Sequence, residues 1–135
     1  MKKEHLNLAE SLLDLFEFKT ISDECGNEYV LYKSSNIKEI KDVEDKTAFE
    51  ALENHIHIFD NITKCKKESA VDFSKKLGKI LLNNLAYQYP NKHFVVFVTV
   101  NTSVVIRFHQ KWDNEPWYYM TDEKYDGTEL IWFDN

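Results

Sequence analysis

Two histidines at alternate positions have the spacing that most directly suggests chemistry in this chain. His55 and His57 flank one isoleucine in the sequence HIHIF, and this alternation predicts a strand over 55–59. Both imidazoles would then lie on one side of the strand and could bind a metal ion, with His109 or an acid completing the site. The alternative is that both are partly buried polar residues hydrogen-bonded at a strand end. Because no second ligand cluster accompanies them, we expect no metal and no other cofactor.

The only arginine of the chain, Arg107, forms a second candidate site with His109. Both lie on one face of a predicted strand, shortly before Asp113 and Glu115. One interpretation is a site for an anionic ligand. The other is a structural Arg107–carboxylate pair that holds the 112–117 loop against the sheet through the bidentate fork that lysine lacks. Lysine outnumbers arginine 16 to 1, so we infer a geometric requirement here and predict the structural pair.

Other catalytic arrangements lack the residues that they need. Cys25 and Cys65 form no CxxC motif. We expect free thiols in a reducing compartment, and the alternative is a single disulfide between them. No serine lies between glycines in a nucleophile elbow, and three isolated glycines cannot build a phosphate-binding loop. No basic patch indicates nucleic-acid binding. The sequence therefore predicts a protein that is not an enzyme.

The net charge of −6 is concentrated at the C-terminal end of the chain. Residues 113–135 contain seven acids and one base, whereas the other 112 residues contain 16 acids and 16 bases. Six aromatic residues are interleaved with these acids. Such a surface disfavours nucleic acid and favours a basic partner protein, with Trp and Tyr as anchors. The predicted partner-binding residues are Trp112, Asp113, Glu115, Trp117, Tyr118, Tyr119, Asp122, Glu123 and Asp126.

One domain spanning residues 1–135 must position these side chains. Periodicity predicts helices over 4–18, 47–54 and 68–89, and strands over 29–32, 55–59, 94–100, from 104 onward and over 129–133. Thr47 and Glu50 match a capping box at the start of the short helix. The stripe of the long helix consists of Val71, Leu77, Leu81 and Leu85, widened by Ala70, Phe73, Ile80 and Tyr87.

This order of elements predicts an α+β fold. An antiparallel sheet would be covered by the N-terminal helix and by one long central helix. The strand over 94–100 is apolar on both faces, so it should be central, and the short connection 101–103 predicts a hairpin. Gly78, in the middle of the long helix, indicates close approach to a strand.

Three stretches of the sequence resemble small bacterial immunity proteins that accompany polymorphic or contact-dependent growth-inhibition toxins. They are ENHIHIFD (53–60), the Leu77-Gly78-Lys79 of the long helix and VVIRFHQKWDNEPW (104–117). The resemblance implies that the chain binds and blocks a cognate toxin domain, often a nuclease, without catalytic residues or a small-molecule substrate. Some such proteins resemble the Whirly fold, which has two antiparallel sheets with helices. A small metal-binding protein or metal-dependent enzyme using His55, His57 and His109 is the alternative.

The expected location is cytoplasmic, without membrane association. The N-terminal region carries Glu4, Glu10 and Asp14 within an amphipathic pattern, which is unlike a signal peptide. No apolar run approaches the length that is needed to span a membrane.

Overall fold

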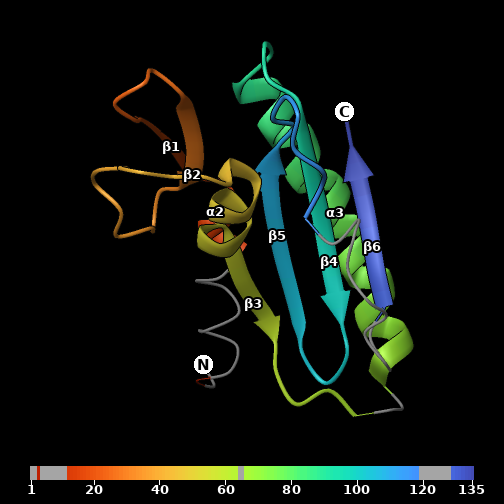
Figure 1. Cartoon of the computed structure of the whole chain (residues 1–135). Helices are drawn as coiled ribbons and strands as arrows, with labels where there is room; N and C mark the ends of the chain where they lie inside the picture. The colour runs from red at the N-terminus through yellow and green to blue at the C-terminus, as the bar shows by residue number, and fades with distance from the viewer. Residues whose placement is uncertain (1–2, 4–11, 64–65, 119–128) are drawn as a thin grey trace.

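The structure, a computed structural model, describes residues 3, 12–63, 66–118 and 129–135, and these residues form an α+β fold (Figure 1). Six strands within them make two antiparallel sheets, one of two strands and one of four. The predicted fold class is therefore confirmed. The elements are β1 (Phe18–Ser22), β2 (Glu28–Tyr32), α2 (Lys46–Glu53), β3 (His55–Phe59), α3 (Lys67–Gln88), β4 (Phe94–Val100), β5 (Val104–Gln110) and β6 (Glu129–Asp134).

The four-stranded sheet has the order β3-β5-β4-β6, and all its neighbours are antiparallel. β4 and β5 form the predicted hairpin, in which Val100 pairs with Val104 and the Asn101 N–H donates to the Ser103 carbonyl at 3.0 Å. β4 is an inner strand, as its apolar residues on both faces predict, because an inner strand of a covered sheet meets side chains on both sides.

Each face of this sheet has a different cover. The long helix α3 packs across one face, behind the sheet in Figure 1. The residues of this layer include Leu77, Leu81, Leu85, Val96, Val98, Ile106 and Phe108. On the opposite face, Val95 and Phe97 pack against Ala51 of α2 and against Trp117 and Tyr118. Trp117 and Tyr118, which come after β5 in the sequence, therefore pack against the core on the face of the sheet away from α3.

The glycine in the middle of α3 lies against β6. A Cβ atom added to Gly78 would be 2.5 Å from Cε2 of Phe133, which is closer than carbon atoms can approach. The predicted close approach is therefore confirmed, and its partner is a ring that β6 supplies. By contrast, Ile80 and Tyr87 do not widen the buried stripe of α3, because they are 48% and 86% exposed.

The prediction of a helix over 4–18 is wrong at its C-terminal end. Residues 12–14 are helical, whereas Phe18 begins β1, a strand that the sequence pattern did not predict. The ring centroid of Phe18 lies 5.8 Å from that of Tyr32 in β2 and 5.6 Å from that of Phe108. These core contacts and the pairing of β1 with β2 override the local helical pattern. The rest of this prediction, residues 4–11, lies outside the described residues.

Among the residues that the structure describes, the edge of β2 opposite β1 has no neighbouring strand. Its backbone N–H groups instead form hydrogen bonds with side chains. The Val30 N–H donates to Oε2 of Glu50, and the Tyr32 N–H donates to Oδ1 of Asn54, both at 3.0 Å. Asn54 Nδ2 in turn donates to the Val30 carbonyl at 2.8 Å. α2 and its C-cap thus attach the small sheet to the rest of the fold (Figure 1).

No helix among the described ranges is both long and apolar enough to cross a membrane.

Candidate functional site

Residues 112–118, here called the post-β5 segment, turn back from β5 onto the start of α2. Oε1 of Glu115 accepts hydrogen bonds from the backbone N–H and the Oγ1 hydroxyl of Thr47, both at 2.7 Å, and Oε2 accepts from the Lys46 N–H at 3.2 Å. The Lys46 ammonium lies 3.3 Å from the same carboxylate. A carboxylate at a helix N-terminus satisfies free N–H groups and interacts favourably with the helix dipole. This contact fixes the segment to α2.

These hydrogen bonds also govern the protonation of Glu115. Partial burial acts to raise the pKa of this carboxyl, but the hydrogen bonds from Thr47 and Lys46 together outweigh it, and the pKa lies below its usual value. Glu115 is therefore ionised at neutral pH, which suits a carboxylate at a helix N-terminus.

The predicted capping box at the start of α2 is wrong. The N-cap is Asp45, whose side chain accepts from the Ala48 N–H at 2.9 Å. Thr47 binds Glu115 instead, and Glu50 faces the interior with no exposed surface. The sequence has the spacing of a capping box, but Thr47 and Glu50 instead bind residues that are distant in the sequence.

Glu50 is the polar centre of this part of the molecule. Its Oε1 accepts from the Gln110 N–H at 2.8 Å and from Nε1 of Trp112 at 2.7 Å. Its Oε2 accepts from the Val30 N–H at 3.0 Å and from Gln110 Nε2 at 2.8 Å. Burial raises its pKa to about 7, although these hydrogen bonds oppose the shift. One carboxylate therefore connects β2, α2, β5 and the post-β5 segment.

His109 anchors the far end of the post-β5 segment. The ring is 1% exposed, its Nδ1 bonds the Gln110 carbonyl at 2.8 Å, and its Nε2 accepts from the Tyr118 N–H at 3.2 Å. A carbonyl can only accept, so Nδ1 carries the proton and the ring is neutral. Burial, the dominant cause, also lowers the pKa of His109. Its role is structural, and neither ring nitrogen is available to a ligand.

Arg107 does not form the predicted pair with Asp113 or Glu115. Its Nη1 donates to the Ala51 carbonyl in the last turn of α2 at 3.3 Å, and the buried Nε has no hydrogen-bond partner within the part of the chain that the structure describes. Holding the post-β5 segment, the task predicted for Arg107, is performed by Glu50, Glu115 and His109.

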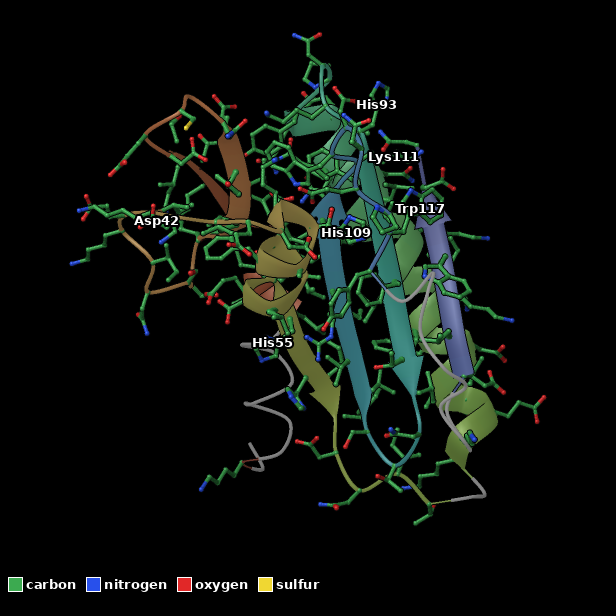
Figure 2. All side chains as sticks on the ribbon, in the orientation of Figure 1. Asp42, His55, His93, His109, Lys111 and Trp117 are labelled. Carbon is green, nitrogen blue, oxygen red and sulfur yellow. The ribbon has the colours of Figure 1, made fainter. Side chains whose placement is uncertain are left out.

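His55 and His57 are exposed residues of β3, with ring centroids 5.8 Å apart, and Figure 2 shows His55 where β3 follows α2. Nδ1 of His55 donates to the Leu52 carbonyl at 2.7 Å, and Nδ1 of His57 lies 3.4 Å from Oδ1 of Asp60. No group of three or more His, Cys, Asp or Glu side chains suited to a metal ion occurs in the described ranges. His109, which would complete the alternative metal site, has both nitrogens engaged as described above.

The predicted partner-binding residues separate into three groups. Three of them form the internal hydrogen bonds described above: Trp112 through its indole N–H, Glu115 through its carboxylate and Tyr118 through its backbone N–H. Asp113 is exposed, and Trp117 is partly buried. Their role in binding stays a prediction. The remaining four, Tyr119, Asp122, Glu123 and Asp126, lie outside the described residues.

Trp117 belongs to a small surface cluster near the end of β6 (Figure 2). The Lys111 ammonium lies 5.3 Å from the Trp117 ring centroid and 2.7 Å from Oδ2 of Asp134. Trp132, two residues before Asp134 on the same face of β6, is 40% exposed. We call Trp117, Trp132 and Asp134, together with the exposed Asp113 four positions before Trp117, the described part of the acidic-aromatic surface.

Sequence reasoning missed Glu50 and Asn54 as the residues that organise this site. A carboxylate and an amide four positions apart share one face of a helix, which was the available signal. That spacing alone does not show that the polar face is buried. The buried residues of α2 are Thr47, Glu50 and Ala51, while Leu52 is 52% exposed.

Residues 1–133 match the family described as "Uncharacterized protein PM0498 family". No curated protein and no solved structure matches the chain.

Proposed function

We propose that this chain, which belongs to the uncharacterized PM0498 family, is an immunity protein that binds a basic toxin domain through its acidic-aromatic surface. The observation that carries the proposal is the confinement of the whole net charge of −6 to residues 113–135. Such a field accelerates association with a basic partner and repels acidic ones. The resemblance of 53–60 and 104–117 to immunity proteins gives the class of partner, with a nuclease domain as the expected target.

The post-β5 segment supports this proposal because it is held before any partner arrives. Glu115, Trp112 and His109 fix its backbone at three places, and Asp113 stays exposed between the first two. A binding loop that is already ordered loses little conformational entropy on association, so more of its contact energy contributes to affinity.

The direct test is co-expression with the toxin domain encoded beside the gene for this chain. We expect rescue of growth and a complex that survives gel filtration at low salt and weakens as salt screens the charges. If the neighbouring domain is neither bound nor neutralised, the proposal is wrong.

Reversal of one exposed charge locates the interface. Asp113→Lys should reduce the association rate constant about threefold or more at low salt, because rim charges act mainly on encounter. Glu24→Lys, at an exposed position in the β1–β2 turn, is the control with the same charge change. Stopped-flow fluorescence measures both rates. Equal rates for the two variants would place the interface away from the post-β5 segment.

A further inference from the structure

We propose that Arg107 and His55 form a binding site for an oxyanion, either a phosphate or a carboxylate. The site lies on the face of the four-stranded sheet opposite α3, beside the last turn of α2. It is separate from the acidic-aromatic surface, and it does not depend on the proposed function.

The first observation is the unused hydrogen-bonding capacity of the guanidinium. Arginine has five N–H donors, and among the described residues Arg107 uses only Nη1, which donates to the Ala51 carbonyl. The Nε atom is buried without a partner there. A buried donor of a charged group that lacks a partner is costly. The Nε–Nη2 edge is also the edge that binds two oxygens of one oxyanion side by side.

The second observation is the register of β3 on β5, which places His55 directly opposite Arg107. The Phe108 N–H donates to the Asn54 carbonyl, so Asn54 and Phe108 are a hydrogen-bonded pair. Because hydrogen-bonded and non-hydrogen-bonded pairs alternate along an antiparallel ladder, His55 and Arg107 are a non-hydrogen-bonded pair. In such pairs the Cα atoms are about 4.5 Å apart and the side chains are closest. Nδ1 of His55 donates to the Leu52 carbonyl, so the ligand meets Nε2. This nitrogen donates to an oxyanion in the imidazolium form of the ring, and in the neutral ring it accepts from the O–H of a protonated phosphate.

The third observation is the local charge. His57 shares this face with His55 and Arg107, because alternate strand residues point to the same side. Within the described ranges, no ion pair joins a carboxylate to Arg107, and Asp60 is paired with His57. Arg107 is therefore a permanent local positive charge in a chain of net charge −6, and the two imidazoles beside it supply polar nitrogen atoms. An oxyanion would supply the acceptors that Arg107 lacks.

The single arginine makes a sharp experiment possible. In the full chain labelled with ¹⁵N, the Nε–H resonance of Arg107 has no arginine counterpart and is assigned at once. We expect inorganic phosphate or acetate to shift this resonance saturably, and sodium chloride at matched ionic strength to leave it in place. Tighter binding of phosphate would indicate a phosphate ligand, and tighter binding of acetate a carboxylate ligand. No shift with either anion, or an equal shift with chloride, would overturn the proposal.

Variants identify the donors. His55→Phe should weaken the preferred anion about threefold to tenfold, because one hydrogen bond is lost, whereas His93→Phe, an exposed histidine before β4, should not. Arg107→Lys keeps the charge but removes the fork, and we expect a loss of about tenfold when binding is followed on the His55 ring protons. Equal affinity in His55→Phe and His93→Phe, or undiminished affinity in Arg107→Lys, would contradict the site.

Discussion

Glu50 is a fully buried carboxylate whose four hydrogen bonds all come from N–H groups. Two of these donors are backbone groups that cannot turn away, so a proton on either oxygen would face a donor. Burial has the opposite effect, because it disfavours the charged form, and it is the larger influence on the pKa. The side chain is therefore poised between two protonation states near neutral pH.

This balance predicts a pH dependence of stability. The pKa of Glu50 rises from 4.5 to about 7 on folding, so between these values the folded state binds more protons than the unfolded state. The contribution of Glu50 is then complete below about pH 4.5 and is lost as the pH rises through about 7, by up to about 3 kcal/mol. Urea unfolding of the wild type and of Glu50→Gln at pH 5 and pH 8 checks this.

The wild type should lose stability relative to Glu50→Gln between the two pH values. His109 and Glu115 also titrate, but they are common to both proteins and cancel in the difference. A carboxyl ¹³C titration of Glu50 gives the same answer if the variant folds poorly. An unchanged difference, or a midpoint near 4.5, would refute the raised pKa.

At the scale of elements, α2 is turned with its polar side inward. Thr47, Glu50 and Ala51 are buried while Leu52 is half-exposed, because the edge of β2 and the post-β5 segment require hydrogen-bond partners there. Patterns of apolar spacing could not predict this orientation. Glu115 is 68 residues from Thr47 in sequence, and no local motif encodes such a contact.

Other elements could be predicted because their own residues determine them. β4 carries apolar side chains on both faces and could only be an inner strand, and 101–103 is short enough for a hairpin. β1 was missed because its five residues, FKTIS, are too few and too mixed to show a clear period. Its strand state comes from pairing with β2. The likeness to the Whirly fold stays a prediction.

Gly78 supplies a test of packing between elements. Gly78→Ala gains about 1 kcal/mol in helix propensity, but the new methyl group would meet Phe133 at 2.5 Å, and overpacking costs about 1–3 kcal/mol. We expect a net loss of about 1 kcal/mol in thermal or urea unfolding. In a Phe133→Leu background the same substitution should be neutral or stabilising. Equal losses in both backgrounds would show that the ring is not the obstacle.

At the scale of the whole molecule, the two sheets are joined by side chains of Glu50, Asn54 and Gln110. The last of these donates from Nε2 to the Glu28 carbonyl at 2.9 Å and also binds Glu50. Asn54 is fully buried and binds β2 at both Val30 and Tyr32. These amide and carboxylate groups therefore add to the aromatic contacts of Phe18 and Tyr32 with Phe108 in holding the small sheet to the larger one.

Asn54→Ala should destabilise the small sheet more than the four-stranded sheet. Loss of its hydrogen bonds leaves buried backbone groups of β2 unsatisfied, and we expect a decrease of about 2–3 kcal/mol in unfolding free energy. Amide exchange in β1–β2 should accelerate more than exchange in β4–β5. Asn83→Ala, at an exposed position of α3, is the control. Uniform acceleration across both sheets would mean that Asn54 stabilises the fold without linking its parts.

Arg107 lies in the middle of β5, paired with His55 on one side and with Phe97 on the other. Since it is the only arginine, an arginine-specific protease has one peptide bond to cleave in the whole chain, and that bond lies within the four-stranded sheet. A protease needs an extended, accessible segment, so cleavage requires the sheet to open. When reclosing is faster than cleavage, digestion at this one bond therefore measures the population of molecules with an open sheet, without any label or engineered site.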